Sequence, residues 1–174
     1  MSDLIYDTGS RETRRIMDLM AKNNQKIAVF EEHKIIGKPV QCTGLVTHHI
    51  KEALKPLNFE KIKRDFLVNT INNTRVYSPD NNFAEIELED NYIIDRVKFD
   101  SVLADKARQE GAEYFLEHSF IGKEENKLIF ETKNKIKRIE LKKDDFIIGA
   151  DGPLSRTAKT FSLYGERRFF HGIQ

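Results

Sequence analysis

Several side chains in this sequence are of types that catalyse reactions or bind metal ions. Residues 7–10 read Asp-Thr-Gly-Ser, the signature of an aspartic protease, and His48 and His49 are adjacent. Aspartic proteases need two such aspartates sharing a proton, and adjacent histidines are expected to point apart on a helix or strand. Cys42 is the one cysteine, and no Cys/His cluster has zinc spacing. We therefore expect neither protease nor metal chemistry.

Two other groups have the position and chemistry of ligand-binding residues. Glu31 ends a continuous apolar run at residues 26–31, typical of a strand buried on both faces of a parallel sheet. In a dinucleotide-binding fold, an acid at the end of the second strand accepts hydrogen bonds from ribose hydroxyls. Asp151 and Gly152 form a turn after the apolar strand expected at residues 145–150, and Ser155 is suited to cap the following helix.

The elements that position Glu31 form one βαβ unit. It comprises a short strand at residues 3–7, a helix at 11–22 with an apolar stripe, and the strand at 26–31. A connection containing Gly and Pro follows at residues 34–45. The mixed region after it is expected to contain a helix at 47–54 and strands at 65–71, 74–77, 83–88 and 92–94.

Residues 96–111 have the clearest helical pattern. Phe99, Leu103 and Ala107 recur at four-residue steps, Asp95 can cap the start, and Gly111 can end the helix in a left-handed conformation. Polar turns separate the four strands expected next, which we interpret as an antiparallel meander at residues 114–120, 127–132, 135–141 and 145–150. The predicted fold class is α/β with an antiparallel appendage.

Composition limits the kinds of partner. The chain has 174 residues, with Lys plus Arg 29 and Asp plus Glu 28, hence a net charge of +1. That balance argues against a nucleic-acid-binding surface, which needs clustered positive charge. The sequence has no apolar run of about 18 residues that would span a bilayer. We expect a cytoplasmic protein, with peripheral membrane contact as the most that it makes with lipid.

Four stretches, in order and at matching distances, resemble the geranylgeranyl reductase family of FAD-dependent flavoproteins. This family includes digeranylgeranylglycerophospholipid reductases. The resemblance extends along nearly the whole chain, and the four stretches are residues 29–31, 36–44, 92–113 and 148–156. The third and fourth are specific as a pair, and the loop at 36–44 favours the reductase branch over aromatic hydroxylases of the same fold.

The resemblance implies a Rossmann-like FAD-binding domain with an antiparallel β-meander and the start of an inserted substrate domain. The FAD-binding domain would be formed by residues 1–45 and 91–174, and the partial substrate domain by 46–90. The cofactor-binding residues that the resemblance implies are Glu31, Cys42, Thr43, Arg96, Phe120, Asp151 and Gly152. It indicates no catalytic residue in this chain.

The function implied is reduction of geranylgeranyl double bonds in the biosynthesis of lipids, phospholipids among them. FAD would be the cofactor, NAD(P)H the electron donor, and a prenyl lipid the substrate. The flavin would carry the redox chemistry, while the protein would position it and exclude water.

The sequence departs from the family in two places. The glycine-rich Gly-x-Gly-x-x-Gly turn is replaced at residues 8–13, where Gly9 is the one glycine and Glu12 adds negative charge near the expected phosphates. We therefore expect weaker FAD binding than in the family. The family also continues past the region matching residues 169–174, so we expect an incomplete cavity and a second polypeptide that completes the fold.

Two alternatives remain open. The chain is either a non-catalytic or partner-dependent fragment that does not hold FAD alone, or a flavin-dependent enzyme of the aromatic hydroxylase type. A bound flavin distinguishes the first alternative from both enzymes, and turnover of a prenyl lipid or an aromatic compound distinguishes the two enzymes.

Overall fold

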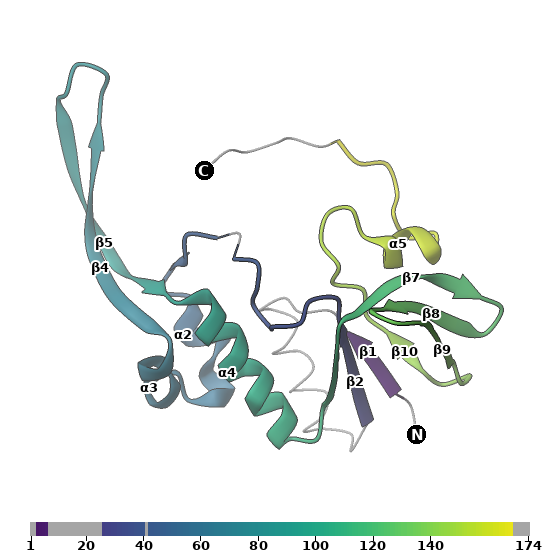
Figure 1. The fold of residues 1–174 in the computed structure, drawn as a ribbon. Coiled ribbons are helices and arrows are strands. Elements are labelled where there is room, and N and C mark those ends of the chain that lie inside the picture. Colours follow the sequence, from purple (N-terminus) through teal and green to yellow (C-terminus); the bar gives the residue numbers. More distant parts are fainter. Residues whose placement is uncertain (1–2, 7–25, 41, 169–174) are drawn as a thin grey trace.

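Three β-sheets and a central helix organise the part of the chain that the structure describes. The computed structural model describes residues 3–6, 26–40 and 42–168. A long hairpin projects from one side of α4, and two sheets lie on the other side (Figure 1). The altered turn at residues 8–13 and the helix expected at 11–22 lie outside the described residues.

The parallel sheet is built around the apolar strand that contains Glu31. Its strands run in the order β10-β1-β2-β6. In that order they are Phe146–Ile147, Asp3–Tyr6, Lys26–Glu31 and Glu113–Leu116. From β2, Ile27 and Val29 pack in a cluster with the end of α4, whereas Phe30 packs with Leu128 and Phe130. Each such buried side chain contributes about 1.5–3 kcal/mol. The predicted strand at 26–31, buried on both faces, is confirmed.

The helix α4 (Arg96–Gln109) joins two of the cores. The Asp95 side chain caps it by accepting a hydrogen bond from the Lys98 backbone N–H at 3.0 Å, and Gly111 follows with a φ of 97°. Phe99 and Leu103 pack in a cluster with the second sheet, whereas Ala107 packs against β2. The predicted helix and both of its end signals are confirmed.

The antiparallel meander differs from its prediction at both ends. It contains β7 (His118–Glu124), β8 (Lys127–Thr132) and β9 (Ile136–Glu140). The strand expected at residues 114–120 is divided at Glu117, whose φ of 57° turns the chain from β6 in the parallel sheet into β7. The last expected strand, at 145–150, is also not part of the meander, because β10 pairs with β1. Local alternation does not specify which sheet a strand joins, and long-range pairing decided both cases.

A second three-stranded sheet has the order β3-β5-β4 and includes the projecting hairpin. Its strands are β3 (Leu45–Val46), β5 (Phe83–Ile94) and β4 (Leu67–Tyr77). The separate strands expected between 65 and 94 merge into two long ones, β4 and β5, because irregularities in pairing, at Leu67/Asn69 and Ile71/Asn73, do not end the ladder.

Between β3 and β4 in the sequence, the chain forms four short helical segments. They are α2 (Ile50–Ala53), the 3₁₀ segment η1 (Lys55–Leu57), α3 (Phe59–Ile62) and the 3₁₀ segment η2 (Lys63–Asp65). The helix predicted at 47–54 is shorter than expected, and α3 was not predicted. Phe59, Ile62 and Phe66 are buried beside Tyr92 and Phe99, so tertiary packing sustains a helical segment of few residues.

The division into a domain of residues 1–45 and 91–174 and an insertion of 46–90 stays a prediction. The strand β5 continues across its second boundary, from Phe83 to Ile94. Among the described residues, the structure contains no helix long and apolar enough to cross a membrane.

Candidate functional site

One cavity is lined by residues from several parts of the chain that are far apart in the sequence. Its volume is about 570 Å³. The end of β2, the loop after it, the first turn of α4, strands β7 and β8, and the segment from β10 to α5 (Arg156–Thr160) all contribute to its wall. Of the residues predicted to bind cofactor, those that line it are Glu31, Cys42, Arg96, Phe120, Asp151 and Gly152.

Glu31 lies at the carboxyl end of β2 and is only 4% exposed. One of its carboxylate oxygens, Oε1, accepts a hydrogen bond from the backbone N–H of His33 at 2.9 Å and lies 2.6 Å from His33 Nδ1. A buried carboxylate needs such partners. The His33 contacts therefore hold an acceptor at the cavity wall, where the sequence predicted a ribose-binding acid.

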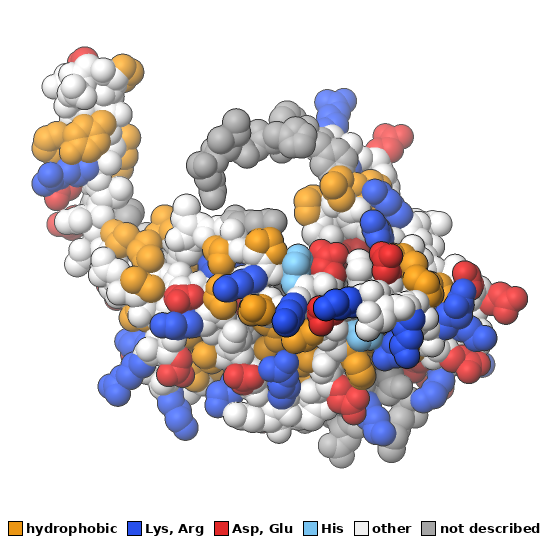
Figure 2. Space-filling view, in the orientation of Figure 1, with side chains coloured by type: hydrophobic (Ala, Val, Ile, Leu, Met, Phe, Trp, Pro, Cys, Tyr) orange, Lys and Arg blue, Asp and Glu red, His pale blue; other side chains and the backbone are white. Residues whose placement is uncertain are grey.

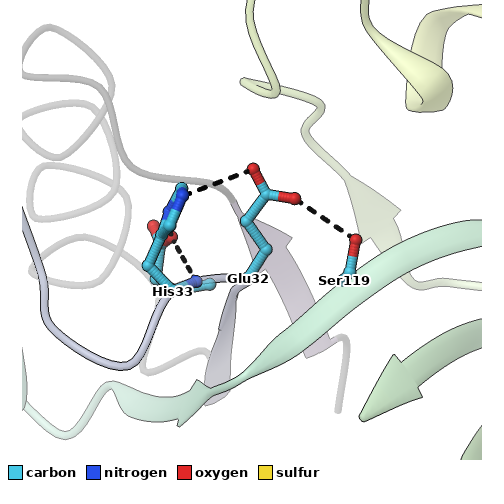
Figure 3. A network of polar contacts seen from close by, with 4 residues as sticks. Glu32, His33 and Ser119 are labelled. Carbon is cyan, nitrogen blue, oxygen red and sulfur yellow. Dashed lines mark hydrogen bonds and ion pairs between the residues drawn. The ribbon is translucent and has the colours of Figure 1, made fainter. Parts of the chain in front are cut away.

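A polar network joins this strand end to the meander (Figure 3). His33 Nε2 lies 3.8 Å from Glu32 Oε1, and the Ser119 hydroxyl donates to Glu32 Oε2 at 3.3 Å. The residues come from the end of β2 and from β7, so the network connects the two sheets at one edge of the cavity. No local signal in the sequence marks Glu32, His33 or Ser119, because their proximity depends on contacts between β2 and β7.

Arg96 begins α4 and presents its guanidinium to the same cavity. Its Nη2 donates to both carboxylate oxygens of Asp100, at 3.2 Å each. Its Nε is buried and has no hydrogen-bond partner in the described part of the chain. Burial raises the pKa of the Asp100 carboxyl, the Arg96 charge opposes this, and the Glu31 charge adds to the rise. The i,i+4 spacing of Arg96 and Asp100 on a helix is the sequence signal for this ion pair.

The turn at Asp151 and Gly152 is held by the start of α5. The Ser155 hydroxyl donates to Asp151 Oδ1, and the Thr157 backbone N–H donates to Oδ2 at 2.8 Å. Burial raises the pKa of Asp151, but hydrogen bonds from Ser155, from Thr157 and from the Asp151 backbone together outweigh burial and lower that pKa. Gly152 has a φ of +74°, which favours glycine.

The first amides of α5 are engaged within the protein. Ser155 caps the helix by accepting from the Ala158 N–H at 2.8 Å, as predicted, and Asp151 takes the Thr157 N–H. These two amides are therefore already engaged and do not serve a cofactor. Their hydrogen bonds go to side chains that precede the helix.

The remaining predicted residues differ in their positions. Cys42 is exposed, lines the cavity, and its sulfur accepts a hydrogen bond from the Gly44 N–H at 3.4 Å. Phe120 lines the wall from β7 and packs edge-on against Phe130, with ring centroids 5.5 Å apart. Thr43 is exposed and is not one of the lining residues, so the cavity does not support its assignment.

His48 and His49 do not point apart, contrary to expectation. Their ring centroids lie 4.0 Å apart, and His48 Nε2 is 3.0 Å from Glu89 Oε2. The pair lies in a turn, where the geometry of regular helices and strands does not apply. Within residues 3–6, 26–40 and 42–168, no group of three or more His, Cys, Asp or Glu side chains could hold a metal ion.

The cavity residues fit a phosphate-containing dinucleotide. An unpartnered, positively charged donor at Arg96 suits a phosphate oxygen. A carboxylate at the end of β2 suits ribose hydroxyls. Both residues line the same cavity.

Two curated proteins are similar in sequence to most of this chain. No protein-family model matches the chain. An uncharacterised Methanosarcina barkeri protein from the nifH2 5′ region is 30% identical over 149 residues, covering 82% of this chain and 78% of the relative. The digeranylgeranylglycerophospholipid reductase of Methanocaldococcus jannaschii is 27% identical, over 85% of this chain and 37% of the reductase.

A solved structure is also similar to this chain in sequence and in fold. The geranylgeranyl bacteriochlorophyll reductase-like protein of Thermoplasma acidophilum is 25% identical, with a TM-score of 0.67 over 95% of this chain and 42% of that protein. The chain is geranylgeranyl reductase-like in sequence and in fold. Its matches correspond to the N-terminal part of the longer family members and span less than half of their length.

The fold of this geranylgeranyl reductase-like chain is also found in other FAD-dependent flavoproteins. The myxobacterial chondrochloren halogenase CndH, an FAD-dependent halogenase, shares it with a TM-score of 0.71 at 12% identity. At that identity the likeness shows the fold alone. The predicted fold class, a Rossmann-like domain with an antiparallel meander, is confirmed.

Proposed function

We propose that this chain forms the FAD-binding part of a reductase that saturates geranylgeranyl double bonds in lipid precursors. The observation that carries the proposal is the convergence of Glu31, Arg96 and the Asp151–Gly152 turn on one cavity. Similarity to digeranylgeranylglycerophospholipid reductase supports the choice of substrate class.

In this proposal each group has a defined task. Glu31, held by His33, accepts hydrogen bonds from ribose hydroxyls, and Arg96 donates to a phosphate oxygen. Phe120 and Cys42 form the wall beside the cofactor. FAD supplies the two-electron redox chemistry when bound. The chain's own residues bind it, orient it and exclude water.

The wider assignments belong to the same proposal. Residues 1–45 and 91–174 form the FAD-binding domain, and 46–90 begin the substrate domain. The substrate is a prenyl lipid, reached by peripheral membrane contact, and NAD(P)H is the electron donor. Each of these depends on the similarity to longer reductases, of which the chain covers about two fifths.

Retention of flavin tests the proposal directly. The purified chain is mixed with FAD, passed through gel filtration, and its visible absorption spectrum is recorded. We expect flavin bands near equimolar stoichiometry, reduced in Glu31→Gln and unchanged in the matched control Glu113→Gln, an exposed acid on β6. A colourless wild-type protein would remove the claim that this chain binds FAD by itself.

A second candidate function is that of a module that acts with another polypeptide. The observation that favours it is the projecting hairpin, where Val76, Tyr77, Phe83 and Ile86 are exposed (Figure 2). Apolar side chains gathered on a protruding element commonly mark an interaction surface. A second chain that completes the reductase fold would cover this hairpin.

The hairpin residues give a test of that candidate. The wild-type chain is compared with the double variant Val76→Lys, Ile86→Lys by light scattering, alone and with the C-terminal part of a longer family member added. We expect a complex with wild type only, with the thermal stability of the isolated chains unaffected. Equal complex formation by the variant would contradict the role of the hairpin.

A further inference from the structure

The Arg96 guanidinium has one donor that is hydrogen-bonded and, within the described part of the chain, one buried donor that is not. Its Nη2 donates to both oxygens of Asp100, whereas its buried Nε has no partner in the described residues. An unmade hydrogen bond at a buried charged group is costly, so such a donor calls for an acceptor. The guanidinium lies on the cavity wall, where a ligand can supply that acceptor.

Asp100 is itself fixed by its surroundings. Its side chain is 19% exposed, and the loop after β2 passes close to it. A Cβ at Gly37 would lie 3.2 Å from Asp100 Cβ and Oδ2, and 3.1 Å from the Val97 Cα. Gly37 also has a φ of +77°, so glycine suits this close approach. The charged groups that act on the carboxyl are Arg96 on its own helix and Glu31 from β2.

We propose that Asp100 is a positioning residue that holds the Arg96 guanidinium against the cavity wall and leaves its Nε for a phosphate oxygen of the bound ligand. The inference rests on the proposed function and deepens it, because it assigns the anionic part of the ligand to one atom. A guanidinium restrained in advance loses less side-chain entropy on binding. Asp100 also lines the cavity, and in this proposal its effect on the ligand passes through Arg96.

A double-mutant cycle tests this relationship. Dissociation constants for FAD and for ADP are measured by titration calorimetry with the full chain and the variants Arg96→Ala, Asp100→Asn and the two combined. We expect each single substitution to raise the dissociation constant about tenfold or more. In the Arg96→Ala background, Asp100→Asn should cause no further loss, because its effect passes through the arginine.

A matched control lies on the same helix. Asp105 pairs with Arg108 at 2.9 Å and is not one of the cavity-lining residues. Asp105→Asn should leave both dissociation constants unchanged. Thermal unfolding of each ligand-free variant verifies folding, and Asp100→Asn keeps the shape of the side chain.

The possible results separate the inference from the proposed function. Additive losses, or unchanged binding in Asp100→Asn, would overturn the inference and leave FAD binding intact. Binding of ADP with the expected coupling, but no binding of FAD, would support the inference and remove the flavoprotein function. A wild-type chain that binds neither ligand would overturn both.

Discussion

At the scale of single residues, some charged groups of the cavity have hydrogen-bond partners within the protein and one donor has none among the described residues. The Glu31 carboxylate accepts from His33, and Asp151 accepts from Ser155 and Thr157, whereas the Arg96 Nε is unpartnered among the described residues. Because the Glu31 and Asp151 carboxylates already accept hydrogen bonds, the orientation of both side chains is fixed. The unpartnered donor is the group whose hydrogen bond a ligand would complete.

Asp151 should make the stability of the chain sensitive to acid. Its pKa is lowered in the folded state, so its contribution is present above the unfolded value of 3.8 and is lost as pH falls through the folded pKa. In Asp151→Asn, the free energy of unfolding should be smaller at neutral pH and fall less steeply below about pH 4. Urea titrations across that range measure it.

The exposed carboxylate Asp144 provides the comparison for this prediction. Asp144→Asn should follow the wild-type pH profile, because Asp144 does not cap a described helix. A profile for Asp151→Asn that is parallel to wild type over the whole acid range would contradict the assignment.

At the scale of elements, close backbone contacts fix where strands and loops meet. Gly44 precedes β3 and accepts a hydrogen bond on its carbonyl from the Ile94 N–H at 2.9 Å. A Cβ on Gly44 would lie 2.2 Å from the Ile94 oxygen, and its φ is +79°. Side chains are excluded at this junction, which connects the cavity loop to the hairpin sheet.

Gly44→Ala should therefore destabilise the chain by about 3 kcal/mol or more, from backbone overlap in addition to the strain of a left-handed alanine. Gly165→Ala is the matched control, because Gly165 has a φ of +63° and no atom within 4 Å of an added Cβ. It should cost about 1–2 kcal/mol. Chemical denaturation measures both, and equal losses would show that overlap at Ile94 is absent.

At the scale of the whole molecule, the three sheets are joined through shared cores. The central helix α4 packs with the hairpin sheet through Phe99 and with the parallel sheet through Ala107. Phe130 of the meander stacks on Phe30 of β2 with ring centroids 4.3 Å apart. The cavity lies where these parts meet, so its geometry depends on all of them.

Phe130→Ala should lower the free energy of unfolding by about 3–5 kcal/mol, since it opens a cavity between the meander and the parallel sheet. Phe130 is only 1% exposed, whereas Ile136 on β9 is 44% exposed and serves as the control. Ile136→Ala should change stability by less than about 1 kcal/mol. Urea unfolding measures both free energies. If Phe130→Ala lowers the free energy of unfolding as little as Ile136→Ala does, the two sheets do not share this core.

The sequence alone determined the features that depend on neighbours along the chain. The apolar run that ends at Glu31 is a buried strand, and Asp95 and Gly111 bound α4 because capping and left-handed stops are local interactions. The motifs at residues 92–113 and 148–156 were sufficient to indicate the reductase family, and with it the α/β fold.

Only the tertiary structure decided which distant segments meet. The positive φ of Glu117 sends two halves of one predicted strand into different sheets, and β10 pairs with β1 across the chain. The approach of Ser119 to Glu32 likewise depends on contacts between β2 and β7. A local sequence pattern indicates whether a segment forms a strand or helix and which of its faces is buried. It does not indicate which of several apolar strands the segment pairs with, because packing of the complete chain decides that pairing.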